Sequence, residues 1–170
     1  MNDPQPDRLS ATAQATPPQT PAFHVSKKSE KITALLKVSP DGRHSPHYLG
    51  YFHCFNQSLY YEAHDVLEDQ WLREREGSRG AFYKGLIQLA GAFVHLQKNR
   101  LKPADALFKL AESNMRLYPS RFEDLDLSEV LSLIEDWRQA LAVSHFTENP
   151  ISKRPSPVLQ IEAHSAFHNL

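Results

Sequence analysis

The residues of this chain best suited to chemistry lie between Tyr60 and Trp71, in the run YYEAHDVLEDQW. At about 100° per residue of an α-helix, His64 and Glu68 lie one turn apart inside the apolar stripe of Tyr60, Leu67 and Trp71. A helix that buries this stripe carries an imidazole and a carboxylate toward the core. An unpaired ionisable group there costs on the order of several kcal/mol. We therefore predict that both side chains are paired, with each other or with polar groups on a facing helix.

The segment that offers such partners runs from Phe82 to Asn99 and is apolar almost all round, as is typical of a central helix. Gln88 and His95 share one of its faces with three small residues, Gly85, Gly91 and Ala92. Small residues let two helix backbones approach closely. We predict that His64 and Glu68 meet Gln88 and His95 in a small buried polar network.

Other residues around this motif have simpler explanations. Glu62, Asp65 and Asp69 form a separate acidic face, typical of a solvated surface, which would favour a cationic ligand or a basic partner if it borders a pocket. Asn56 could reach the motif from the preceding helix, but it is more simply a helix terminator. Trp71 is predicted to pack in the core.

Three interpretations of the motif stay open. In the first, His64, Glu68 and His95 bind a metal ion, with Gln88, Glu62 or Asp65 nearby. The helical di-iron pattern Glu-x-x-His and the zinc-protease pattern His-Glu-x-x-His are both absent from the sequence. In the second, His64 and Glu68 act as acid and base on a small ligand in a pocket between helices. In the third, the polar quartet is a satisfied core network in a non-catalytic interaction or regulatory module. We predict the third, with no bound cofactor.

The motif residues also carry a family resemblance. They are Phe55-Asn56, then Tyr61-Glu62-Ala63-His64-Asp65 with Glu68 and Trp71, then Gly85-Leu86-Ile87-Gln88 with Ala90 and His95. Over about residues 51–117 this arrangement resembles the domain of unknown function 309 family. The chain departs from the family pattern at Asp65, where the family usually has Glu, and at Ser58, where it commonly has Gly. The resemblance implies a compact all-helical domain and no established activity, so no catalytic residue is carried over.

The composition excludes several classes of protein. The chain has 170 residues, of which 41% are hydrophobic, and a formal net charge of −1. A nucleic-acid-binding protein needs clustered excess Lys and Arg, so no such partner is expected. No apolar run reaches the roughly 18 to 20 residues of a membrane span, and the N-terminus lacks the apolar stretch of a secretory signal. The single cysteine, Cys54, is predicted to be a buried small hydrophobic residue. We expect a cytoplasmic protein.

The chain divides into three parts by composition. Residues 1–45 are Pro-rich and polar and are predicted to be disordered, apart from one short helix over 29–38 with several lysines around it. Residues 46–145 are predicted to form an all-α, antiparallel bundle of about five helices, and residues 146–170 a loose tail. A protein or peptide partner, or a small ligand between helices, fits such a bundle, and no feature specifies an oligomeric state.

Turn and cap residues give the expected helix boundaries. Ser45 is predicted to cap the first helix, Asn56 to end it, and Ser58 to cap the second. Asn99 is predicted to end the third helix, and Asp126 to cap the fifth.

Overall fold

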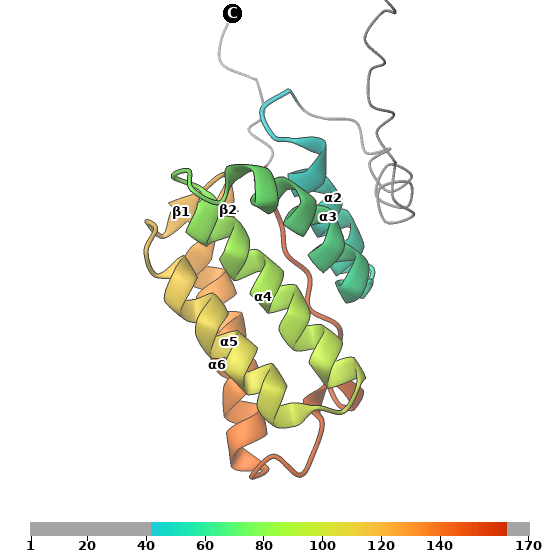
Figure 1. Cartoon of the computed structure of the whole chain (residues 1–170). Coiled ribbons are helices and arrows are strands. Elements are labelled where there is room, and N and C mark those ends of the chain that lie inside the picture. Colours follow the sequence, from blue (N-terminus) through green and yellow to red (C-terminus); the bar gives the residue numbers. More distant parts are fainter. Residues whose placement is uncertain (1–41, 163–170) are drawn as a thin grey trace, which may run out of the picture.

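The structure, a computed structural model, describes residues 42–162 and shows an all-α antiparallel bundle (Figure 1). The predicted fold class is confirmed. In chain order the elements are α2 (Pro46–Asn56), α3 (Tyr60–Glu74), α4 (Gly80–Gln97), α5 (Leu101–Met115), β1 (Arg121–Phe122), β2 (Leu125–Asp126), α6 (Leu127–Val143) and a 3-10 turn, η1 (Pro150–Ser152). Within the described residues, no helix combines the length and the apolar content needed to cross a membrane. The short helix expected over 29–38 lies outside the described residues.

Helix α4 is the centre of the bundle, as its apolar pattern predicts. Its Phe93 ring lies 5.5 Å from the ring of Phe55 on α2, 4.8 Å from Tyr60 on α3, 5.3 Å from Phe108 on α5 and 4.9 Å from Trp137 on α6. These distances are typical of stacked and edge-to-face aromatic pairs. One side chain therefore joins all four surrounding helices.

Small residues on α4 set the approach of α5. A Cβ atom added at Gly85 would lie 3.1 Å from Met115 Cγ and 3.3 Å from the Ala111 carbonyl oxygen, closer than ordinary contacts. A Cβ atom at Gly91 would lie 3.1 Å from Leu107 Cδ1 but 3.9 Å from the His64 ring. The glycines thus serve mainly the contact of α4 with α5.

Three of the predicted helix boundaries are confirmed. Ser45 caps α2 and accepts a hydrogen bond from the Tyr48 amide at 3.1 Å. Asp126 caps α6 and accepts from the amide of Ser128 at 2.8 Å. Asn99 follows the end of α4 with a φ of 54°, the left-handed conformation that asparagine tolerates.

The predicted end of α2 at Asn56 is confirmed, but the predicted cap of α3 is wrong. Asn56 is the last residue of α2, and the left-handed position is Ser58, with a φ of 60°. Ser58 cannot also cap α3, whose N-cap is Leu59 without a side-chain hydrogen bond. A left-handed residue is least strained as glycine. Glycine at position 58 would therefore relieve strain that the Ser58 backbone carries.

A small hairpin between α5 and α6 was not predicted. Strands β1 and β2 pair antiparallel, with Arg121 opposite Asp126 and Phe122 opposite Leu125. The two residues of the loop, Glu123 and Asp124, both have positive φ, at 50° and 60°.

The loose C-terminal tail expected from residue 146 is wrong for residues 147–162. This stretch, called the strap below, contains η1 and buries Pro157 and Leu159 against the bundle. Ile161 then forms a β-bridge with Leu125 of the hairpin. The strap is polar and Pro-containing in composition, but a few buried apolar side chains and backbone hydrogen bonds suffice to hold it against the bundle. The bundle domain therefore extends beyond the predicted boundary at residue 145.

Candidate functional site

The motif on α3 faces outward more than the sequence predicts. The His64 side chain is 32% exposed and its Nδ1 atom lies 3.3 Å from Asp65 Oδ1. Glu62, Asp65, Glu68 and Trp71 are also partly exposed. The ring of His64 packs beside Gly91 of α4, so it lies at the border of the α3–α4 contact. The motif is a surface feature anchored at one edge.

The predicted polar quartet does not form one network. Gln88 Oε1 accepts a hydrogen bond from Asn114 Nδ2 of α5 at 2.8 Å, so it turns away from α3. His95 Nδ1 is buried and has no hydrogen-bond partner within residues 42–162. Gln88 is three residues from Gly85, and α5 packs on that shared face, which is the physical reason for its direction.

His95 has an unfavourable environment for charge. Burial, Arg100 and Lys98 all lower the pKa of His95 below its ordinary value of 6.5. Its buried Nδ1 atom and the buried Tyr60 hydroxyl are both without hydrogen-bond partners in the described chain. The neutral form of His95 is therefore favoured in the folded state.

A different set of three residues has the geometry of a cation site. One ligand atom each from His64, Asp65 and Glu68 can be chosen so that all lie within 4.8 Å of one another. A nitrogen and two carboxylate oxygens suit Zn²⁺ or Mn²⁺. Compared with the predicted ligands, Asp65 takes the place of His95.

Asn56 has a structural position away from the motif. Its Nδ2 atom donates to the Leu159 carbonyl and its Oδ1 atom accepts from the Leu159 amide, both at 2.8 Å. This two-bond arrangement imitates the pairing of neighbouring strands. Asn56 therefore fastens the strap to the end of α2.

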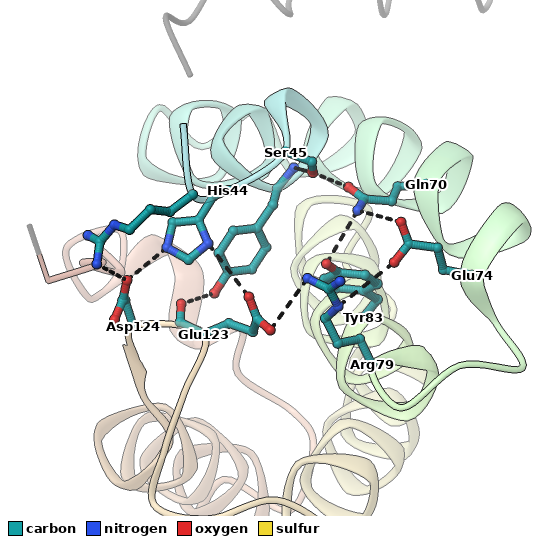
Figure 2. Close-up of polar contacts among 10 residues, drawn as sticks. His44, Ser45, Gln70, Glu74, Arg79, Tyr83, Glu123 and Asp124 are labelled. Atoms are coloured by element: carbon teal, nitrogen blue, oxygen red, sulfur yellow. Dashed lines mark hydrogen bonds and ion pairs between the residues drawn. The ribbon is translucent and has the colours of Figure 1, made fainter. Parts of the chain in front are cut away.

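A larger polar cluster, which sequence reasoning missed, joins the start of α2 to the hairpin (Figure 2). The His44 ring is 5% exposed and lies between two carboxylates. Its Nε2 atom is 2.9 Å from Asp124 Oδ2 and its Nδ1 atom is 3.6 Å from Glu123 Oε2. Arg43 is 3.3 Å from Asp124, and Arg79 is 3.5 Å from Glu123. We call these five residues the hairpin cluster.

The hairpin cluster continues into an amide and hydroxyl chain between α3 and α4 (Figure 2). Ser45 Oγ donates to Gln70 Oε1, and Gln70 Nε2 lies 3.1 Å from Glu74 Oε1 and 3.3 Å from the Tyr83 hydroxyl. Gln70 is only 6% exposed. The helix-capping serine of α2 is thus connected to both neighbouring helices.

Tyrosine hydroxyls in this region stay protonated. Burial, reinforced by Glu123, raises the pKa of Tyr48 far above its usual range, and Tyr48 donates to the Glu123 carbonyl at 2.9 Å. Burial raises the pKa of Tyr83 to about 12, against the opposing effect of Arg79. The Tyr48 hydroxyl donates to a carbonyl and the Tyr83 hydroxyl accepts from Gln70 Nε2, and neither phenol is activated as a base or nucleophile. Each carboxylate of the hairpin cluster faces a histidine and an arginine, which is typical of a salt-bridge network with a structural role.

The hairpin turn itself is strained. Two-residue loops in which both residues have positive φ normally use Asn-Gly or Asp-Gly, because residues with a Cβ atom disfavour that conformation. Here Glu123 and Asp124 take it. The only hint in the sequence is a short alternating run, RFEDLDL, between two helices. The contact of His44 with this loop spans 80 residues, so no local pattern indicates it.

Another ionic clamp holds α5 to α6. Arg138 of α6 contacts Asp105 at 3.0 Å and Glu112 at 2.7 Å. Burial opposes ionisation of Asp105, but hydrogen bonds from Lys109 and Arg138 outweigh it, so the pKa of Asp105 is lowered. A hydrogen bond from Arg116, with added charge from Arg138, lowers the pKa of Glu112. The carboxylates are thus held ionised.

Two surface hollows of the described chain lie at different places. One of about 520 Å³ lies between the end of α6 and the strap and includes none of the motif residues. A smaller one of about 340 Å³ borders Trp71, Lys84 and Asn114. Trp71 therefore lines an open depression instead of filling the core completely, although it packs against the core cluster.

The comparison with family models agrees with the motif. Residues 48–107 match the model described as domain of unknown function (DUF309), which confirms the resemblance seen in the sequence. No curated protein and no solved structure matches the chain. The matched segment contains most of α2, all of α3 and α4 and the start of α5, and with them every residue of the motif. Over residues 48–107 the chain is therefore similar to the domain of unknown function 309 family.

Proposed function

We propose that this protein is a non-catalytic interaction module whose recognition surface is the outer side of α3. Tyr61 and Leu72, at the two ends of this surface, are 53% and 55% exposed. Asp65 and Glu68 lie between them at helical spacing, so all four residues share one side of the helix. We call these four residues the α3 face. The pairing of exposed apolar anchors with acids between them is the observation that carries the proposal.

The chemistry of the α3 face selects a type of partner. Two apolar side chains eleven residues apart on a helix are separated by about 16 Å along its axis. A short amphipathic helix spans that distance and can place apolar side chains against both anchors. The acids between them favour lysine or arginine in the partner, since opposite charges speed association and fix the register. The expected partner is therefore a basic amphipathic segment of a protein in the cytoplasm.

The polar groups of the bundle support a non-catalytic role. The carboxylates of the hairpin cluster face cations, and both Tyr48 and Tyr83 have raised pKa values that keep their hydroxyls protonated. Activated catalytic groups usually have pKa values shifted toward neutrality.

The proposal is tested with a short synthetic peptide that carries leucine and lysine at helical spacing. Its binding to the full chain is followed by fluorescence anisotropy, with a peptide of the same composition in scrambled order as the reference. Tyr61→Ser combined with Leu72→Ser should weaken binding by about tenfold or more, because each exposed anchor contributes about 1 kcal/mol when buried.

The matched control is Leu110→Ser combined with Leu117→Ser. These two leucines are 50% and 71% exposed on α5 and just beyond its end, so they test for unspecific apolar binding. Equal losses in both double variants, or equal binding of the scrambled peptide, would reject the α3 face as a recognition surface.

A second candidate function is binding of a divalent cation by His64, Asp65 and Glu68. The spacing of their ligand atoms, all within 4.8 Å, favours it. Such a site would allow metal-assisted acid–base chemistry with an open coordination position. Elemental analysis of protein purified without an affinity tag should then show stoichiometric zinc or manganese, and His64→Gln should abolish it. His53→Gln, at an exposed histidine of α2, is the control that should retain it.

A further inference from the structure

We propose that the groove between α6 and the strap binds a free α-amino acid with a branched aliphatic side chain. Two hollows lie along this groove, a first of about 520 Å³ and a second of about 450 Å³. Asp136 and Arg154 are the residues that line both hollows. The junction of the hollows therefore carries one negative and one positive charge. The groove shares no residue with the α3 face, so this inference does not depend on the proposed function.

Arg154 is held in place by contacts that leave its charge unpaired. Its Nη1 atom donates to the Asp136 carbonyl at 3.2 Å, and its guanidinium lies 5.7 Å from the centre of the Trp137 ring. Within residues 42–162, no carboxylate forms an ion pair with Arg154. A guanidinium has five N–H donors, so most of them remain available. A planar donor group that is positioned on two sides suits a ligand carboxylate, which it can bind through two parallel hydrogen bonds.

Asp136 supplies the opposite charge at the same junction. Its backbone carbonyl accepts from Arg154, but its exposed carboxylate has no ion-pair partner in the described part of the chain. The two charged groups are thus neighbours that do not pair with each other. An α-amino acid carries its ammonium and its carboxylate on one carbon atom, so one ligand can pair with both groups. A ligand with a carboxylate alone would bring that charge close to the Asp136 carboxylate, which repels it.

The first hollow offers a place for the side chain of the ligand. Val143 lines this hollow and is 73% exposed, so the fold leaves its apolar surface uncovered. Ala140, one turn earlier on α6, and Pro150 of the strap add apolar surface beside it. In the second hollow, Trp137 is already buried in the core. A volume of about 520 Å³ is within the range of small-ligand pockets, roughly 300–1,000 Å³. A leucine-like side chain therefore lies in the first hollow, against Val143.

The remaining charges of the first hollow are already paired. Lys153, the residue before Arg154, forms an ion pair with Glu148 at the rim of the hollow. Both side chains are 60% exposed. Lys153 thus has the same sign of charge as Arg154 in nearly the same place, but it lies outside the junction and has an acid of its own. It is a built-in reference for the effect of net charge.

The test is a titration of the isotope-labelled full-length protein with L-leucine, followed by two-dimensional NMR. A ligand of this size is expected to bind at about millimolar concentration, with shifts at the backbone amides of residues 140–144 and 151–154. Glycine should bind about tenfold more weakly, because it has no side chain to bury against Val143. Leucine methyl ester lacks the carboxylate charge and N-acetyl-leucine lacks the ammonium charge. Each should bind about tenfold more weakly than leucine, because a charge-assisted hydrogen bond is lost.

Two single variants and two matched controls test the junction. Arg154→Met and Asp136→Asn should each weaken leucine binding about tenfold, because each removes one of the two charges that the ligand contacts. The controls are Lys153→Met, which removes the paired cation, and Glu135→Gln, which removes a neighbouring acid of α6 that borders a different hollow. Both controls should retain leucine binding within about twofold, since exposed charges outside the site contribute little. Circular dichroism checks that all four variants retain the helical fold.

Several results would overturn the inference. If leucine caused no shifts in the groove, the hollows would not be an amino-acid site. If N-acetyl-leucine bound as tightly as leucine, the groove would recognise a carboxylate alone, such as the end of a peptide. An equal loss of binding in Lys153→Met and Arg154→Met would assign the effect to net charge. Glycine binding equal to that of leucine would contradict the role of the first hollow.

Discussion

Replacement of His44 by alanine is the most informative change in the hairpin cluster. The ring is 5% exposed and sits between Asp124 at 2.9 Å and Glu123 at 3.6 Å. It also packs on Tyr48, with ring centroids 5.1 Å apart. His44→Ala leaves the two carboxylates facing a small cavity while they remain on a strained turn. We expect the free energy of unfolding to fall.

The expected decrease in the free energy of unfolding depends on the partners that each carboxylate retains in the His44→Ala variant. Removal of one member of a fully buried ion pair costs about 3–5 kcal/mol. Glu123 and Asp124 are about a fifth exposed and keep Arg79 at 3.5 Å and Arg43 at 3.3 Å, so the lost contacts should cost less than that range, about 1–2 kcal/mol. The loss of ring packing adds to it. The expected decrease in the free energy of unfolding is about 2–3 kcal/mol.

Urea unfolding followed by circular dichroism measures this decrease from the transition midpoint and slope. His53→Ala is the matched control, because His53 is exposed on α2 and should cost less than about 0.5 kcal/mol. A double-mutant cycle with Asp124→Asn should give a coupling of about 1–2 kcal/mol, since the residues touch. A cost below about 0.5 kcal/mol for His44→Ala, or a coupling near zero, would refute the view that this ring supports the turn.

Three further predictions concern single positions. Ser58→Gly should raise the urea midpoint, by about 1 kcal/mol in unfolding free energy, because it relieves the left-handed conformation of residue 58; a lowered midpoint would show that the Ser58 hydroxyl contributes more than the strain costs. Asp105 and Glu112 have lowered pKa values in the folded state. Their ionised forms therefore contribute to the free energy of unfolding above about pH 4.5, and this contribution is lost as the pH falls through the folded-state pKa values. Arg138→Met should therefore flatten the fall of stability on acidification, and an unchanged slope in acid unfolding curves would contradict this. His95 has a pKa below its ordinary value, so its imidazole binds a proton more readily in the unfolded chain, and stability should fall as the pH drops through about 6.5. His95→Leu should remove this fall in thermal melts recorded between pH 8 and about pH 5. If the fall persisted in the variant, it would belong to another group.

Local chemistry in the sequence predicts the parts of the fold that depend on neighbours in the chain. The caps Ser45 and Asp126 and the turn residue Asn99 follow from side-chain hydrogen bonding and φ preference, and all three are confirmed. The central position of α4 follows from an apolar pattern that leaves no polar side. These features need no knowledge of distant residues.

The direction of side chains on that central helix could not be predicted in the same way. Because α4 is apolar all round, periodicity does not say which neighbour lies on which side. The predicted network places Gln88 toward α3, but Gln88 contacts Asn114 of α5. The apolar stripe predicts His64 in the core, but its side chain is about one-third exposed at the edge of the helix contact. The proposed binding role of these residues stays a prediction.

The hairpin cluster and the strap lie beyond sequence reasoning for another reason. The contact of His44 with Asp124 joins residues 80 positions apart, and that of Asn56 with Leu159 joins residues 103 positions apart. Each uses common polar residues in segments whose composition is typical of loops. These contacts form only in the assembled bundle, so no periodic pattern in the sequence predicts them.

The strap also decides what can be removed from this protein. A fragment of residues 48–107, the part that matches the family model, would lack Trp137, which packs on Phe93. It would also lack Leu159, whose backbone binds Asn56. A chain that ended at residue 107 would expose these surfaces to water and would be prone to aggregate. The segment that matches the family model is therefore shorter than the smallest segment expected to fold alone. Fragments for biochemical work should retain the chain through residue 162.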